Sequence, residues 1–267
     1  MKKIILLITF LVLSLTAFTA YAVDKKQAQD VTTYLKQGDI TGDKKEDLIE
    51  IRGTPFEEGS LFLKEITLKI KTSEGKTLKS KLDAGYEPAI KFNDLNHDKI
   101  NDILLRVETG ESGGSSNYYL YTAINAKQEE LPVPEPLSII SQFEEGYKAM
   151  IKIDATGESH IFDLSDRKAK YDQLGLYNEG KLNEPMELIV SPYSTLKPVK
   201  ISKDKNKTGL RGVQRISGVA NNDTIGFVES SWVYENGKWR IIDTSIRKNS
   251  KTKQKKQVDV TNPSNVT

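Results

Sequence analysis

The chain has 267 residues, of which 37% are hydrophobic, so it can bury a core as one large domain or two smaller ones. Charged residues make up 28% and are nearly balanced, with a formal net charge of +2 and no basic stripe interleaved with aromatic residues, which argues against nucleic-acid binding. The absence of cysteine excludes a disulfide framework, and with only two histidines it argues against a zinc site.

The first 22 residues have the pattern of a secretory signal peptide. A positive start, Met1-Lys2-Lys3, precedes an apolar run over residues 4–17 and a small-residue cleavage site, Ala20-Tyr21-Ala22. We therefore expect export, with a mature chain that begins at Val23 and touches the membrane only through its signal peptide. The alternative is an uncleaved anchor, because the apolar run is close to the length that spans a bilayer. Without a cysteine there is no lipobox, so the expected location is secreted, extracellular or associated with the cell envelope.

Residues 23–130 are expected to form a β domain. Alternation of apolar and polar residues, most regular over 61–72, is the signature of half-buried strands. Gly53-Thr54-Pro55 predicts a break, and Ser73-Glu74-Gly75-Lys76 predicts a hairpin turn. The expected strands are 31–35, 47–52, 61–72, 77–82, 89–92, 102–108 and 118–124.

Residues 94–102, Asp-Leu-Asn-His-Asp-Lys-Ile-Asn-Asp, form the most informative stretch. Oxygen-bearing side chains occupy positions 1, 3, 5 and 9, and an apolar strand follows. This spacing suits a hard cation such as Ca²⁺, which takes six to eight oxygen ligands. The expected ligands are the side chains of Asp94, Asn96, Asp98 and Asp102 and the backbone carbonyl of Ile100.

A second copy of this pattern lies earlier in the chain. Residues 39–47 carry aspartate at positions 1, 5 and 9 and threonine at position 3, and an apolar strand again follows. Two matching loops at a repeat-like distance favour a common role. The expected ligands here are the side chains of Asp39, Thr41, Asp43 and Asp47 and the carbonyl of Lys45.

Both loops resemble the calcium loops of FG-GAP and VCBS-type repeats, the blade units of integrin-like β-propellers, whose pattern is D-x-[D/N]-x-D-G-x-x-D-[L/I]. Residues 110–120, Gly-Glu-Ser-Gly-Gly-Ser-Ser-Asn-Tyr-Tyr-Leu, are also similar to the loop and strand that follow the second motif in small exported VCBS-repeat proteins of Gram-positive bacteria. The family's glycine at position 6 is replaced here by Lys44 and Lys99. The resemblance implies a structural Ca²⁺. The alternative is two ordinary turns, because Asp and Asn also favour turns by bonding their own backbone.

The second half is expected to be a separate β-rich subdomain over residues 137–247. Pro132, Pro134 and Pro136 mark the boundary, and residues 137–143 are expected to be a short helix or an irregular link. A helix is predicted over 165–174, capped by Ser165 and ended by Gly175. The expected strands are 147–153, 160–164, 209–216, 224–234 and 239–246, the last two joined by a hairpin at Asn236-Gly237.

Three further features complete this half. Residues 201–210 lie where a third calcium loop would be expected, but they carry lysine in ligand positions, so we predict a decayed or unrelated turn that does not bind calcium. Trp232 and Trp239 are expected to pack on the core. Residues 248–267 hold five lysines and one aspartate, which predicts a basic, disordered tail; the alternative is contact with an anionic envelope.

The sequence offers little support for catalysis. Gly110-Glu111-Ser112-Gly113-Gly114 matches the G-x-S-x-G pattern, but a strand follows it where a nucleophile elbow needs a helix. Only His97 and His160 are available as bases, and His97 lies inside an acidic loop. We therefore expect a flexible glycine turn, and the absence of a credible nucleophile or cofactor motif favours a protein that is not an enzyme.

The expected fold is mainly β, with FG-GAP/VCBS-like strand–calcium loop–strand units in a partial or irregular propeller-like arrangement and one or two short helices. The expected function is a secreted or envelope-associated, non-catalytic, calcium-stabilised binding or structural module whose partner is an unknown protein or envelope polymer. The alternative is a secreted hydrolase of envelope polymers with its site in residues 137–247, which a cleft with two carboxylates and exposed aromatic residues would favour. A third hypothesis is a purely structural component of the envelope or spore surface.

Overall fold

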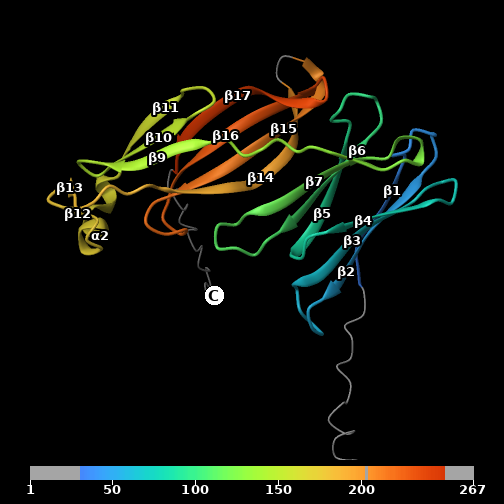
Figure 1. Cartoon of the computed structure of the whole chain (residues 1–267), viewed down its shortest axis with the longest axis horizontal. Coiled ribbons are helices and arrows are strands. Elements are labelled where there is room, and N and C mark those ends of the chain that lie inside the picture. Colours follow the sequence, from blue (N-terminus) through green and yellow to red (C-terminus); the bar gives the residue numbers. More distant parts are fainter. Residues whose placement is uncertain (1–30, 202–203, 250–267) are drawn as a thin grey trace, which may run out of the picture. The chain divides into compact units, whose positions relative to one another are not determined.

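The structure is a computed structural model that describes residues 31–201 and 204–249 (Figure 1). It is mainly β, with 59% of the described residues in strands and 6% in helices, and its described sheets are antiparallel and form no closed barrel. The mainly-β prediction is thereby confirmed. The predicted signal peptide, residues 1–22, and all but the first two residues of the predicted basic tail lie outside the described residues. In the part of the chain that the structure describes, none of the helices has the length and apolar character needed to cross a membrane.

The chain divides into two compact units. Among the described residues, unit 1 comprises 31–92, Ile100–Thr109 and Tyr119–Leu131, and unit 2 comprises Asn93–Lys99, Gly110–Tyr118, 132–201 and 204–249. The last change of unit falls at the start of the proline-containing segment. Two short segments of the first half, 93–99 and 110–118, therefore belong to the second unit.

The first half of the chain forms two four-stranded antiparallel sheets. The first has the order β1-β2-β3-β4, with bounds Val31–Gly38, Asp47–Pro55, Leu63–Lys71 and Thr77–Leu82. The second has the order β5-β6-β7-β8, with bounds Tyr86–Asn93, Asp102–Glu108, Ser116–Thr122 and Glu129–Leu131. Each sheet follows chain order, and in each the acidic loop connects the first strand to the second.

The period-2 pattern of β3 explains how the first sheet acquires a buried face. Ile66, Leu68 and Ile70 are buried, whereas the intervening Thr67 and Lys69 are only partly covered. Since successive side chains of a strand point to opposite sides, one face joins the core and the other remains outward. The core of unit 1 includes Ile40, Ile49, Ile51, Ile66, Leu68, Ile70, Ile103, Leu105 and Val107.

The predicted break at Gly53-Thr54-Pro55 is wrong, because β2 continues to Pro55. Gly53 is paired with Ile66 in the ladder, and a Cβ atom at this position would lie 2.6 Å from the Leu63 side chain. The glycine therefore makes room for a core leucine and does not end the strand.

Three further sheets of the described chain lie in unit 2. The order β11-β10-β9 joins strands with bounds Ser159–Asp163, Lys148–Ile153 and Ile139–Glu144. The order β14-β15-β16-β17 joins Ile189–Ile201, Asp204–Ser217, Thr224–Glu235 and Lys238–Lys248, and β12 (Tyr177–Asn178) pairs with β13 (Lys181–Leu182). The short helical segments of the described chain are the 3-10 turns η1 (Ile124–Ala126) and η2 (Ser165–Arg167) and the helix α2 (Lys168–Gln173).

Residues 201 and 204–210 belong to the β14–β15 hairpin, whose register pairs Pro198 with Leu210, and residues 202–203 lie outside the described residues. Two local predictions in this half are wrong. Residues 139–143 belong to strand β9 and not to the predicted short helix or irregular link. The helical segment begins as predicted, but Ser165 does not cap it, since neither η2 nor α2 has a side-chain cap hydrogen bond.

The core packing expected of both tryptophans holds for Trp232 and not for Trp239. Trp232 is buried, and Trp239 is half-buried with its ring edge-to-face against Tyr234 at 5.2 Å between centroids. The indole N–H of Trp239 also donates to the carbonyl of Pro132 at 2.6 Å.

Candidate functional site

The first acidic loop is closed by its own hydrogen bonds. The carboxylate of Asp39 accepts the backbone N–H of Gly42 at 2.7 Å and that of Lys44 at 2.9 Å. Asp43 accepts the N–H of Lys45 at 2.9 Å and the hydroxyl of Ser73. These bonds hold the pKa of Asp43 below its usual value, the Ser73 hydroxyl being the main cause and the Lys45 amide the next.

Asp47 is the buried end of this loop. Its side chain has no exposed surface, and Oδ2 accepts the N–H of Ile40 at 3.0 Å and both the N–H and the hydroxyl of Thr41 at 3.1 Å. Oδ1 accepts the N–H of Ser73 at 2.9 Å. Each predicted carboxylate of this loop thus already accepts protein donors on both of its oxygens.

The second loop begins with a similar set of contacts. Asp94 Oδ2 accepts the N–H of Lys99 at 3.0 Å, the counterpart of the Asp39–Lys44 bond. The amide oxygen of Asn96 accepts the N–H of Asp98 at 3.0 Å, and its amide nitrogen donates to Asp98 at 2.7 Å. Asp102, at the start of β6, is 1% exposed.

The backbone of the two loops also agrees at positions 4 and 6. Gly42 and His97, at position 4, have φ values of 82° and 67°, and Lys44 and Lys99, at position 6, have values of 65° and 76°. The lysines therefore adopt the left-handed conformation that glycine adopts more easily. The two loops therefore have positive φ at the same two positions, 4 and 6.

The loops differ in what they leave for a cation. Asp94 Oδ1 is buried and has no hydrogen-bond partner among the described residues. No carboxylate oxygen of Asp39, Asp43 or Asp47 is both buried and without a partner. A buried carboxylate oxygen without a donor favours a bound cation or water. Across the described chain, no group of three or more His, Asp or Glu side chains could hold a metal ion, so a cation here would also need amide, hydroxyl or carbonyl oxygens.

The segment 110–116 is a turn fixed by its neighbours. Gly114 N–H donates to the carbonyl of Glu111 at 2.8 Å, and φ is positive at Gly110 and Gly114. The hydroxyl of Ser112 accepts the side-chain amide of Asn221 at 2.6 Å. The histidine rings lie elsewhere: Nε2 of His97 is 2.9 Å from the carbonyl of Thr208, and His160 packs on the ring of Phe162.

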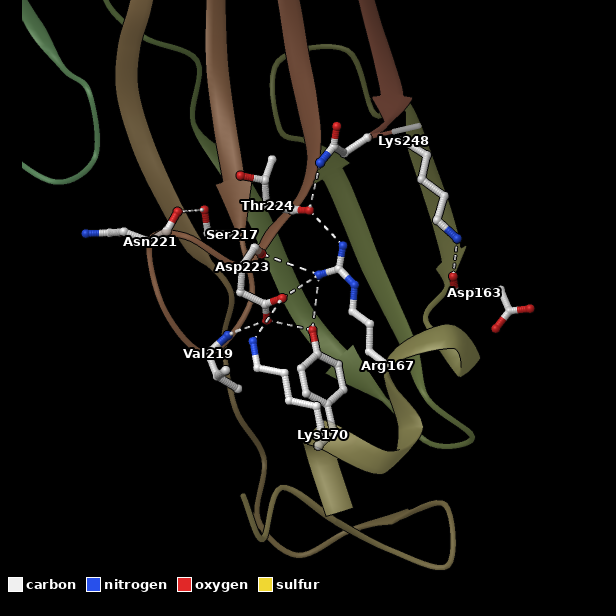
Figure 2. A network of polar contacts seen from close by, with 11 residues as sticks. Asp163, Arg167, Lys170, Ser217, Val219, Asn221, Asp223, Thr224 and Lys248 are labelled. Carbon is white, nitrogen blue, oxygen red and sulfur yellow. Dashed lines mark hydrogen bonds and ion pairs between the residues drawn. The ribbon is translucent and has the colours of Figure 1, made fainter. Parts of the chain in front are cut away.

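Sequence reasoning did not identify the polar network around Asp223, which Figure 2 shows. Asp223 lies in the turn between β15 and β16 and is 7% exposed. Its carboxylate is 2.8 Å from the guanidinium of Arg167 and 3.7 Å from the ammonium of Lys170. It also accepts the hydroxyl of Tyr171 at 2.8 Å and the N–H of Val219 at 3.2 Å.

This network attaches the η2–α2 segment to the β15–β16 turn. Arg167 also donates to the carbonyl of Thr224 at 2.7 Å, and Tyr171 is fully buried, which raises the pKa of its hydroxyl far above the usual range. Since Asp223 is surrounded by donors, its role is to fix the backbone. The Asn-Asn-Asp run at 221–223 signals a turn, but no local signal points to Arg167, 56 residues earlier.

A cleft of about 760 Å³ lies beside this network in unit 2. It is lined by parts of the segments 170–176, 183–186 and 219–222. Leu174 is 57% exposed and Met186 38% exposed, so the cleft offers apolar surface together with Lys170 and Glu184. A concave, partly apolar hollow with a few polar groups is the usual form of a ligand site.

A smaller hollow of about 460 Å³ shares the Asn183–Met186 rim. Four glutamates line it: Glu144, Glu145, Glu184 and Glu187. Two of them are engaged, since Glu144 accepts the side chain of Gln142 at 2.6 Å and Glu145 accepts the N–H of Leu182 at 3.2 Å. Its aromatic lining residue, Phe143, is 2% exposed, so it provides no sugar-stacking platform.

Comparison with known proteins finds two similarities. Residues 137–247 match the family model described as the YybI C-terminal domain, the same range that the sequence assigns to the second subdomain. The uncharacterized protein YybI of Bacillus subtilis (strain 168) is 29% identical over 201 residues, which cover 73% of this chain and 76% of that protein. No solved structure matches the chain.

Proposed function

We propose that this protein is exported and acts outside the cell or at its envelope as a non-catalytic binding module whose first half is stabilised by calcium. Export is inferred from the signal-peptide pattern of residues 1–22. The observation that carries the calcium proposal is the buried Oδ1 of Asp94, which has no donor among the described residues and belongs to a loop with the spacing of a calcium site.

The second loop is the calcium site of this proposal. Asp94, Asn96 and Asp98 hold the cation, and the spacing adds the carbonyl of Ile100. Asp102, at the ninth position, is a ligand by the spacing alone, because the described residues bring no three acidic side chains together around one ion. The ion offsets the repulsion among these carboxylates and, because it binds only the folded loop, stabilises the fold by mass action. The first loop is assigned a different role: it folds without a cation, because its carboxylates accept backbone and hydroxyl donors.

The resemblance to propeller blades is part of the same proposal. A blade is a four-stranded antiparallel sheet, and both sheets of the first half are four-stranded meanders with an acidic loop after the first strand. We assign each of these two sheets as one FG-GAP/VCBS-like unit. The cleft of about 760 Å³ in unit 2 is the proposed ligand site, since it combines exposed Leu174 and Met186 with polar groups at its rim.

Thermal unfolding of the mature chain, residues 23–267, tests the calcium proposal. With a Kd of about 10⁻⁴–10⁻³ M, 10 mM Ca²⁺ adds about 1.4–2.7 kcal/mol, equivalent to a rise in Tm of roughly 3–10 °C over the value in EDTA. Asp98→Ala should abolish this rise, whereas Asp43→Ala should lower Tm equally with and without calcium. A Tm that is the same in calcium and EDTA would refute the calcium site.

The hydrolase alternative is favoured by one observation, the four glutamates around the smaller hollow. Paired carboxylates are the usual acid–base groups of glycoside hydrolysis. Release of reducing ends from peptidoglycan or other envelope glycans by the wild type, and its loss in Glu184→Gln or Glu187→Gln, would establish this activity. Equal signals from wild type and both variants would dismiss it.

A further inference from the structure

The outward face of the first sheet carries a cluster of positively charged side chains. The register of β2, β3 and β4 gives two neighbouring rows of cross-strand partners on this face. One row is Arg52, Thr67 and Lys81, and the other is Glu50, Lys69 and Lys79. The rows are separated by two residues, or about 7 Å along the strands. Four cations therefore lie on three adjacent strands within an area of a few residues.

These side chains line a hollow. A groove of about 380 Å³ lies over β2, β3 and β4, and its lining includes Arg52, Lys69, Lys79 and Lys81 together with Glu65 and two threonines. No aromatic residue lines this groove. The groove lies wholly within unit 1, on the side of the sheet opposite the buried Ile66, Leu68 and Ile70.

Glu50 positions two of these four side chains, Arg52 and Lys69. It is 2.8 Å from Arg52 and 3.7 Å from Lys69, and it accepts the hydroxyl of Thr32 at 2.9 Å. Burial would raise the pKa of Glu50, but the hydrogen bonds from Arg52 and Thr32 and the charges of Arg52 and Lys69 outweigh it and hold the pKa below its usual value. Glu50 therefore stays ionised and holds the side chains of Arg52 and Lys69, both of which line the groove.

The other two positive charges, those of Lys79 and Lys81, are not balanced by a neighbouring carboxylate in the described part of the chain. Lys79 and Lys81 make no ion pair with the described part of the chain, and Lys79 is directly opposite Lys69. Like charges at directly opposed positions destabilise a sheet. A multivalent anion lying across the three strands would remove this repulsion.

We propose that the outward face of β2–β4 binds a flexible anionic polymer of phosphodiester units. The chemistry of the groove selects this class: lysine ammonium groups act as point charges for phosphate, and threonine hydroxyls donate to phosphate oxygens. The lack of aromatic residues disfavours single-stranded nucleic acid, which binds by base stacking. A concave groove without exposed apolar residues fits a single polymer chain better than a membrane surface. The proposal is independent of the calcium loop.

Binding of poly(glycerol phosphate) to the mature chain, measured in EDTA over 50–300 mM NaCl, tests the proposal. Lys79→Gln/Lys81→Gln should lose at least about 10-fold in affinity at 50 mM NaCl, and the slope of log K against log salt should fall by about 1.4, or 0.7 for each lost charge. The matched control, Lys76→Gln/Lys91→Gln, removes two exposed lysines of the same unit outside the groove and should lose less than about 2-fold.

A charge-conserving variant distinguishes loss of charge from loss of folding as the cause of weaker binding. Lys79→Arg/Lys81→Arg should keep wild-type binding even if the glutamine pair is unstable. Four results would overturn the proposal: no binding by the wild type at 50 mM NaCl, an equal loss in the control pair, equally tight binding of poly-L-glutamate, or binding of anionic phospholipid vesicles without binding of the soluble polymer. Because calcium is absent throughout, failure here leaves the calcium proposal untouched, and the reverse holds for the thermal experiment.

Discussion

Asp47 accepts the backbone N–H of Ser73 at 2.9 Å and so joins the first acidic loop to the β3–β4 turn, 26 residues further along the chain. The same carboxylate holds the loop itself through Ile40 and Thr41. An acidic residue that the sequence places among metal ligands thus serves as the hydrogen-bond centre of two turns. Because Asp47 satisfies donors in both turns, the first prediction concerns its removal.

Asp47→Ala should lower the free energy of unfolding by about 3 kcal/mol, because it leaves several buried N–H groups without an acceptor. Urea unfolding of the mature chain in EDTA measures the effect. Glu74→Ala, in the turn next to Ser73, changes only an exposed pair with Lys76 and should stay within about 0.5 kcal/mol of the wild type. Similar values for both variants would show that the Asp47 contacts contribute nothing.

Lys99→Gly and Lys44→Gly should each raise stability by up to about 1 kcal/mol, since glycine adopts a positive φ without the strain that a lysine bears there. Lys45→Gly provides the matched control. Its φ is not in the left-handed region, so added freedom of the unfolded chain should lower stability by up to about 1 kcal/mol. Chemical denaturation of the three variants measures whether the free energy of unfolding rises or falls. A lower free energy of unfolding in all three would contradict the prediction.

Gly218→Ala should disrupt the Asp223 network. A Cβ atom at this position would lie 2.3 Å from Asp223 Oδ2 and 2.8 Å from the hydroxyl of Tyr171, so the buried pair must separate, at a cost of about 2 kcal/mol. In Gly113→Ala the nearest atom is the Ser191 hydroxyl at 3.5 Å, which is an ordinary contact. Differential scanning calorimetry should therefore show a clear drop in Tm for Gly218→Ala alone.

Glu50 should make unit 1 sensitive to acid. Its folded pKa lies below the ordinary value of 4.5, so the ionised carboxylate contributes stability above that pH, and this contribution is lost as the pH falls through the folded pKa. In Glu50→Gln this part of the pH dependence should disappear. Unfolding followed from pH 7 to pH 3 should show the two proteins converging as the pH falls, and parallel curves would contradict the assignment.

Local patterns in the sequence determined much of the β architecture. Strand β6 coincides with the predicted range 102–108 and β4 with 77–82, because alternation and turn residues act within a few positions of each other. The equivalence of the two acidic loops was also visible, since it depends only on the spacing of aspartates along the chain. The structure adds that both loops share the left-handed positions 4 and 6.

Tertiary structure alone decided where strand β14 runs and what the acidic side chains contact. Pro192 and Pro198 argue against a strand at 189–201, yet β14 forms at the edge of its sheet, where a missing N–H costs little. The partners of Asp47 and Asp223 lie up to 26 and 56 residues away, and the sequence has no local signal for such pairs. Turns and alternation are local properties of the chain, whereas the donor that meets a buried carboxylate is set by how distant segments pack.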